Sequence, residues 1–411
     1  MTRLSRPRKL SWVGVLSFGS GLPFGIFKEQ LPIWLRVSGV SVETIGGLSA
    51  LATAWSAKLV WSPLVDKIGR RQSWIAASLM LAGGSLLGAA AVGPHALWPL
   101  VALLTIFTLA AATQDIAVDA YTIGILDKGE EGPANSARVA SYRLAMWFAG
   151  GFTVALAGFL AWRSVLGLTA AMLAGLGLLV LRAPPLPIEQ QPADTKLWRG
   201  LVDWMRRPGA VTLAAMVLLY KLPDGALGPM VRTFWVDAGV SPVEIGVLFS
   251  PLTILATIAG ALIGGPLVAK IGILGGLFWF GLAQAATNLA YAAAAFSGGG
   301  TPVVLSAALI ESLGGGMSTA AFLSLLMRVC EKRRAAVEYA LLSGMFAATR
   351  DLSSAFSGVG VAQLGYGGFF AATTLLALPG LVLVFSRRLA ARVGEPPLAR
   401  DPSNRSGPSA Y

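Results

Sequence analysis

The sequence predicts an all-α membrane protein with twelve transmembrane helices in two pseudo-symmetric six-helix bundles. Three observations predict this fold: long apolar runs, basic clusters between the runs, and a repeat shared by the two halves. Of the 411 residues, 55% are hydrophobic and 13% are charged, and the mean hydropathy is +0.69. A soluble chain of this length needs more charge to cover its surface. We therefore expect the chain to lie in a lipid bilayer.

Twelve apolar stretches are long enough to span a membrane, which takes about 20 mainly apolar residues. Tight hairpins are expected at Ala161 and Gly365. The basic segment from Arg3 to Lys9 and the apolar run after it imitate a signal peptide, but the run continues to Leu35, so we interpret it as the first span. The predicted spans are 10–34, 45–65, 74–92, 97–126, 137–160, 162–182, 210–235, 245–269, 271–295, 302–328, 336–362 and 366–386.

Four segments follow from these spans. Residues 1–182 are predicted to form an N-terminal six-helix bundle, and residues 210–386 a C-terminal one. The Pro-rich stretch 183–209 is predicted to be a cytoplasmic linker. The polar tail 387–411 is predicted to be disordered and cytoplasmic, because it has little apolar surface to bury.

Lys and Arg residues predict the orientation of the chain. They gather in the N-terminal segment, the linker, the tail and alternate loops, whereas the opposite loops hold little beyond Arg36, Arg163 and Arg232. Because basic loops stay cytoplasmic, both termini are expected on the cytoplasmic side of the inner (plasma) membrane. This topology explains the net charge of +12, and no nucleic-acid partner is expected.

The composition also argues against an enzyme or a metalloprotein. The chain has one histidine, His95, and one cysteine, Cys330, so neither a histidine metal cluster nor an internal disulfide is expected. Since no Gly-Lys pair occurs, a Walker A phosphate loop is excluded. We find no nucleophile–base motif and expect no cofactor.

Short motifs repeat between the two halves. Gly-Leu-Pro-Phe-Gly at 21–25 matches Lys-Leu-Pro-Asp-Gly at 221–225, and Ile-Gly at 45–46 matches 245–246, both at an offset of 200. Pro-Leu-Val-Asp-Lys-Ile-Gly at 63–69 recurs, with one change, at 266–272. Parallel repeats related by an axis along the membrane normal are typical of one large class of secondary transporters.

Ionisable residues within the predicted spans are the main indication of function, because each costs about 2.5–3.5 kcal/mol at the helix centre. Lys28, Lys221 and Arg350 are candidates for contacts with an anionic substrate. Glu311 and Asp224 are candidates for proton coupling, since burial favours the neutral form of a carboxyl group. Other charges within the spans are Glu29 and Asp351.

Four charges converge at one depth in the first half: Lys58, Asp115, Asp119 and Arg143. Asp115 and Asp119 are four residues apart and share a helix face. We expect Asp115 to pair with Arg143, with Lys58 as the alternative partner. The cluster fits either a structural network of ion pairs or a gate and proton relay.

The Leu-Pro-x-Gly repeat predicts paired helix interruptions in the first and seventh helices, because proline removes a helical hydrogen bond. Such paired interruptions indicate the central site of a transporter, although proline kinks also occur without any ligand. Lys221 and Asp224 flank the second interruption and are expected to line the substrate site together.

Two resemblances add to this interpretation. The loop Asp66-Lys67-Ile68-Gly69-Arg70-Arg71 resembles the signature loop of the major facilitator superfamily, which implies that Asp66, Arg70 and Arg71 help to gate the cytoplasmic side. Residues 113–121, 58–66 and 20–23 resemble the family of AmpG-type muropeptide permeases and acetyl-CoA transporters. Some siderophore importers resemble that group as well.

We therefore expect a monomeric secondary transporter that works by alternating access. The expected substrate is a polar or anionic small molecule of the muropeptide, siderophore or acyl-nucleotide class, and coupling to protons is expected. A receptor or assembly factor on the same scaffold is the alternative. Such a protein needs neither intramembrane titratable groups nor two broken helices.

Overall fold

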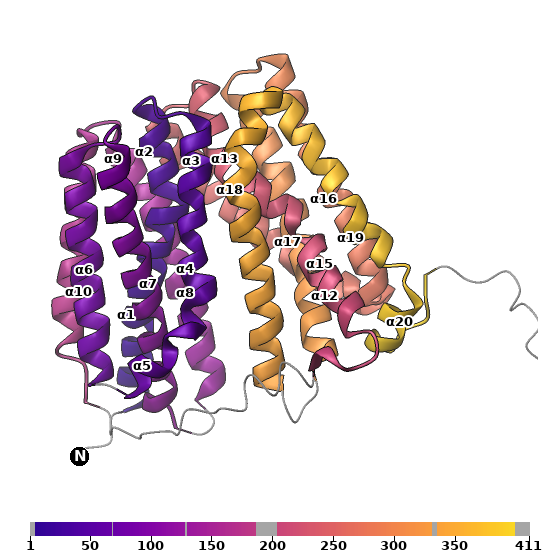
Figure 1. Ribbon diagram of the computed structural model, residues 1–411, viewed down its shortest axis with the longest axis horizontal. Helices are drawn as coiled ribbons and strands as arrows, with labels where there is room; N and C mark the ends of the chain where they lie inside the picture. Colours follow the sequence, from indigo (N-terminus) through magenta and orange to yellow (C-terminus); the bar gives the residue numbers. More distant parts are fainter. Residues whose placement is uncertain (1–4, 68, 128–129, 186–203, 331–334, 399–411) are drawn as a thin grey trace, which may run out of the picture.

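A computed structural model describes residues 5–67, 69–127, 130–185, 204–330 and 335–398, and its regular elements are helices. Two bundles of upright helices lie side by side, one built from the first half of the chain and one from the second (Figure 1). We call the end where α1 begins the N-terminal face, and the opposite end, where α2 and α13 end, the far face.

The first bundle contains six spans. The first span passes from α1 (Arg6–Gly25) through a π-helical turn, η1 (Ile26–Gln30), to α2 (Leu31–Val37). The second is a series of short helices from α3 (Val42–Ser49), through η2 (Ala50–Ala52), α4 (Thr53–Ala57) and η3 (Lys58–Val60), to α5 (Ser62–Lys67). The others are α6 (Arg71–Val92), α7 (Leu97–Ile125), α8 (Glu131–Trp147) continued by η4 (Phe148–Phe152) and α9 (Thr153–Leu156), and α10 (Trp162–Val180).

The second bundle repeats this plan. Its first span is α12 (Ala210–Tyr220) followed by α13 (Leu222–Asp237), and its second is α14 (Pro242–Glu244), η5 (Ile245–Phe249) and α15 (Ser250–Ile271). The rest are α16 (Ile273–Ser297), α17 (Thr301–Val329), α18 (Ala335–Leu376), α19 (Leu378–Leu383) and the short α20 (Arg387–Val393).

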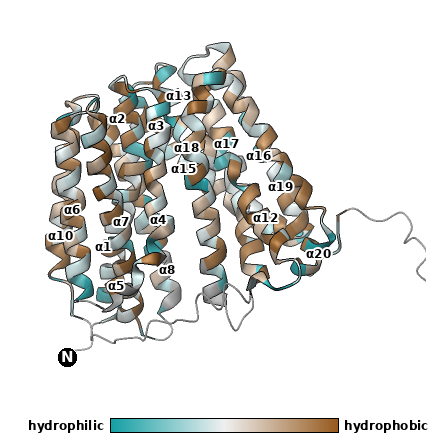
Figure 2. Cartoon of the chain, in the orientation of Figure 1, coloured by the Kyte–Doolittle hydropathy of each residue, from teal (hydrophilic) through white to brown (hydrophobic). Residues whose placement is uncertain are grey.

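The predicted twelve helices and all-α fold are confirmed. Ten continuous helical segments among the described residues are long and apolar enough to span a membrane. One of them holds two spans, because Gly365 (φ 66°, ψ 170°) forms the expected hairpin within α18. The span from Val42 to Lys67 is the remaining one, and its 3₁₀ turns divide it into shorter pieces. Hydrophobic residues are frequent along the helices (Figure 2), as expected of helices that span a bilayer.

The prediction of disorder for 387–411 is wrong for its first part. Residues Arg387–Val393 form α20, which buries Leu389, Ala390 and Val393. Glu395 accepts hydrogen bonds from the backbone N–H groups of Ile273 and Leu274 (2.8 and 3.0 Å), so the start of the tail caps α16. Residues 399–411 and most of the predicted linker, 186–203, lie outside the described residues.

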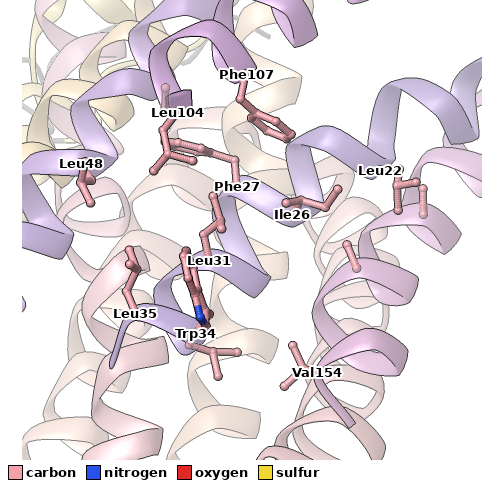
Figure 3. Close-up of a cluster of buried hydrophobic side chains, with 14 of the residues drawn as sticks. Leu22, Ile26, Phe27, Leu31, Trp34, Leu35, Leu48, Leu104, Phe107 and Val154 are labelled. Atoms are coloured by element: carbon pink, nitrogen blue, oxygen red, sulfur yellow. The ribbon is translucent and has the colours of Figure 1, made fainter. Parts of the chain in front are cut away.

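The core of the first bundle positions the π-helical turn. Ile26, Phe27 and Leu31 point into an apolar cluster that includes Leu104 and Phe107 of α7 (Figure 3). The apolar side of this turn is therefore fixed by packing, while the neighbouring Lys28 and Glu29 face the other bundle.

The halves meet closely at the far face. A Cβ atom placed on Gly46 would lie 2.6 Å from the N atom of Gly358, and one on Gly246 would lie 2.3 Å from the carbonyl oxygen of Gly151. Gly46 and Gly246 are equivalent positions of the repeat. Within the described ranges, the side-chain bonds between the halves lie at mid-depth or toward this face. The structure is thus closed at the far face.

Candidate functional site

A cavity of about 380 Å³ lies between the two bundles, and both bundles contribute its walls. This volume falls in the usual range for small-molecule sites. Aromatic residues from both halves line it, among them Phe24, Phe27, Trp235 and Tyr291. Its charged lining residues are Lys28, Glu29, Arg143, Asp224, Arg232, Glu311 and Arg350.

Lys28 and Arg350 share one carboxylate across the interface between the halves. The Nζ atom of Lys28 lies 3.0 Å from Oδ1 of Asp351, and the Nε atom of Arg350 lies 3.4 Å from the same oxygen. Ser56 donates a hydrogen bond to the other oxygen of Asp351 (2.9 Å). Because two cations face one fully buried anion, this cluster keeps a surplus positive charge at the cavity.

Glu29 and Arg232 form a second ion pair between the halves. The guanidinium of Arg232 also stacks over the ring of Trp235, at 4.3 Å from its centroid. Sequence reasoning placed Arg232 among the outer charges and gave it no site role. Its position eight residues after Asp224 was the available signal, because that spacing returns to the same helix face.

Only one of the two predicted helix interruptions is present. The backbone leaves the helical conformation at Lys221 (φ −104°, ψ 7°), between α12 and α13. At the equivalent place in the first half, Pro23 lies inside the continuous helix α1. The first span departs from α-helical geometry only at the π-helical turn that follows, Ile26–Gln30, so the expected break at the Pro23 motif is absent.

Asp224 lines the cavity, but Lys221 lies behind it. Lys221 is 2% exposed, and its Nζ atom contacts Oδ2 of Asp224 at 2.5 Å, Thr319 Oγ1 at 3.2 Å and Ser318 Oγ at 3.3 Å. The predicted direct contact between Lys221 and substrate therefore does not match the position of this side chain, which is occupied by protein oxygens.

Glu311 reaches the cavity from α17 and differs from the other acids in its partner. Its Oε1 atom accepts a hydrogen bond from the side-chain amide of Gln284 at 3.2 Å. The neighbouring Gly314 and Gly315 leave space for this contact, since a Cβ on either would lie 3.3 Å from Oε1 of Gln284. A carboxyl group held by an amide is chemically suited to gain and lose a proton.

The charge cluster of the first half exists with different pairing. Lys58 forms an ion pair with Asp115 and lies 3.5 Å from Asp119, which also pairs with Arg138. The predicted pair of Asp115 with Arg143 is wrong, because Arg143 lines the central cavity. Positions 138 and 143 differ by about 140° around a helix of 3.6 residues per turn, so both arginines cannot face α7.

The predicted gate loop is described in part. Asp66 lies in α5, and its side chain is outside the described residues. Arg70 is exposed, and Arg71 donates a hydrogen bond to the carbonyl oxygen of Ala120 at 2.9 Å. This bond ties the loop to α7 of the same half.

Among the described residues, no group of three or more His, Cys, Asp or Glu side chains is arranged to hold a metal ion.

A sequence model of the Major Facilitator Superfamily matches residues 12–358 of this chain. The chain belongs to the Major Facilitator Superfamily. This major facilitator protein is 33% identical to an anhydromuropeptide permease of Escherichia coli over 383 residues, covering 90% of this chain and 78% of that one. It is 26% identical to a putative transporter, AmpG 4, of Rickettsia conorii, covering 93% and 97% of the two chains. The resemblance to AmpG-type permeases is confirmed.

Solved structures agree with the major facilitator fold. The crystal structure of the nucleoside transporter NupG superimposes with a TM-score of 0.71 at 17% identity, covering 93% of this chain and 98% of that one. A bacterial Spinster homologue in an inward-facing conformation gives 0.72 at 12% identity, covering 96% and 98%. The chain is a multi-pass membrane transporter, as the sequence predicted, and not an enzyme.

Proposed function

We propose that this transporter carries an anhydromuropeptide, a sugar joined to a short carboxylate-bearing peptide, across the inner membrane by proton-coupled alternating access. The observation that carries the proposal is the 33% identity to the anhydromuropeptide permease over 90% of this chain. The basic clusters support cytoplasmic termini. In that orientation the closed far face lies outside.

The charges of the cavity suit such a substrate. Lys28 and Arg350 share Asp351, and Arg143 also lines the cavity, from the first bundle. Guanidinium groups bind carboxylates through paired hydrogen bonds, so these cations are our candidates for holding the peptide carboxylates. The aromatic rings of Phe24, Phe27 and Tyr291 offer apolar faces to the sugar.

Glu311 is the proposed proton carrier. An ionised carboxylate is costly in a site shielded from water unless a cation accompanies it, and the bonding partner of Glu311 is the neutral amide of Gln284. Closure of the cavity around Glu311 is therefore favoured by a bound proton, and opening to water permits its release. Asp115 and Asp119 remain candidates for a relay in the first half.

Uptake by the purified protein in liposomes tests both the proposed substrate class and the proposed proton carrier. We expect a labelled anhydromuropeptide to accumulate against its gradient when a proton gradient is imposed. Glu311→Gln should abolish accumulation but retain exchange of labelled for unlabelled substrate, because exchange requires no net proton movement. Glu43→Gln, at an exposed carboxylate of α3, is the matched control and should behave as wild type.

Two results would contradict the proposal. Exchange that is absent for anhydromuropeptides and present for a siderophore or an acyl-nucleotide rejects the substrate class. Undiminished gradient-driven accumulation by Glu311→Gln rejects the proton carrier while leaving the substrate class intact.

A further inference from the structure

We propose that Lys221 is a built-in counterion that keeps Asp224 charged throughout the transport cycle, leaving Glu311 as the single proton-accepting carboxyl group of the second half. Lys221 would thus set the number of protons carried with each substrate. The inference rests on the proposed proton coupling, but its central claim concerns the charge of Asp224 and is measurable without transport.

The surroundings of Lys221 fix its ammonium group. Oxygen atoms of Asp224, Ser318 and Thr319 contact Nζ at 2.5–3.3 Å. Ser318 donates a hydrogen bond to the hydroxyl of Tyr220 (3.2 Å), which donates to the carbonyl oxygen of Leu277 (2.9 Å). These bonds tie α12, α13, α16 and α17 around one side chain. Lys221 cannot reach the substrate cavity without breaking this network.

The two carboxylates that line the second half of the cavity have unequal partners. Asp224 bonds to the Lys221 ammonium at 2.5 Å, whereas Glu311 bonds to the amide of Gln284 at 3.2 Å. Both carboxyl groups line the same cavity. Because like charges in a shielded site disfavour joint ionisation, the carboxyl group in direct contact with the ammonium is the one expected to stay ionised.

Two other cations nearby have carboxylate partners of their own. Arg232 of α13 pairs with Glu29, and Arg350 of α18 contacts Asp351. On α16, the titratable side chain that faces the cavity is Tyr291. The only charged residue of α15 is Lys270, one residue before the helix ends. Arg143 of the first half also lines the cavity, but among the described residues Lys221 is the cation whose contact with Asp224 is direct.

Removing the ammonium should transfer the counterion role to a proton. In Lys221→Met two carboxylates remain and the cation is gone, so Asp224 must bind a proton when the cavity closes. In Asp224→Asn the ammonium is released and balances Glu311 instead. The number of protonated carboxyl groups should therefore rise by one in the first variant and fall by one in the second.

Infrared spectroscopy of the purified protein in lipid measures the number of protonated carboxyl groups directly, through their C=O stretching band. We expect Lys221→Met to gain a band that disappears in the charge-free double variant Lys221→Met/Asp224→Asn. Lys221→Arg should keep the wild-type spectrum, because it retains the charge. In liposomes, Lys221→Met should carry one additional proton per substrate, measured from the substrate gradient that a given proton gradient sustains.

Each outcome decides the proposal. A folded Lys221→Met protein without the additional band overturns it, since Asp224 is then ionised without the ammonium. If Lys221→Met does not fold, Asp224→Asn decides: loss of the Glu311 band supports the counterion role, and an unchanged band overturns it. If wild-type transport proves independent of protons, the proposed coupling fails, while the infrared result still assigns the charge of Asp224.

Discussion

The Nε atom of Arg36 lies 2.6 Å from Oδ1 of Asp237, in a bond that joins the ends of the first spans of the two halves. Both helix ends are followed by a glycine with positive φ, Gly39 at 81° and Gly239 at 82°, which only glycine adopts without strain. Tyr366 donates to the other oxygen of Asp237 at 2.6 Å. This cluster helps to hold the far face closed.

Asp237→Ala should therefore favour opening of the far face. Ion pairs at the protein surface contribute about 0.2–1 kcal/mol, which corresponds to at most about a five-fold change in the ratio of closed to open molecules. Distances between spin labels at Val37→Cys and Ser241→Cys, in a Cys330→Ser background, report the ratio. An unchanged distance distribution would show that Arg36 and Asp237 do not hold the face.

Gly246→Leu should prevent closure of the far face. A Cβ at this position would lie 2.3 Å from the carbonyl oxygen of Gly151 and 2.6 Å from the Cβ of Ala155, so the bundles must separate to admit a side chain. We expect a folded protein that binds substrate but does not transport it. The same spin labels should show the open far face.

Gly265→Leu is the matched control for this change. Gly265 lies on the same span, and a Cβ there meets no atom within 4 Å. This variant should transport normally. Equal loss of transport in both variants would point to a general intolerance of larger side chains in that span. It would count against a specific role for the contact between Gly246 and Gly151 in closing the far face.

Asp115→Asn should destabilise the first bundle by up to about 3 kcal/mol, because it leaves the ammonium of Lys58 without its main partner. Lys58→Gln/Asp115→Asn should recover part of the loss, whereas Arg143→Gln/Asp115→Asn should not. Melting temperatures in detergent measure all three. Rescue by Arg143→Gln alone would contradict the pairing described above.

The termini should both be cytoplasmic. A fluorescent reporter that matures only inside the cell, fused after Tyr411, should be bright. An enzyme reporter that is active only outside the cytoplasm should be silent at the same place. The opposite pattern would invert the topology that the Lys and Arg residues predict.

Hydropathy and the internal repeat were sufficient to predict the fold, because lipid imposes one requirement on every span: its backbone groups must bond within the helix. The repeat also located Gly46 and Gly246, although nothing in the sequence alone showed that they meet Gly358 and Gly151. Those contacts depend on how the bundles dock, which periodicity does not report.

The candidate site was predictable by residue type but not by pairing. Intramembrane charge identified Lys28, Asp224, Glu311 and Arg350, all of which line the cavity. Partners depend on helix rotation, and the depth argument for Asp115 and Arg143 did not include it. Lys221 was expected to line the site together with Asp224 and instead lies behind it, since a sequence cannot show which way the chain turns at an interruption.

The interruption at Lys221 gives the second half a backbone break at its proline motif, whereas in the first half α1 continues through Pro23. The residue at that break also carries the ammonium that contacts Asp224. One residue therefore joins the backbone break of the second half to a carboxylate that lines the cavity.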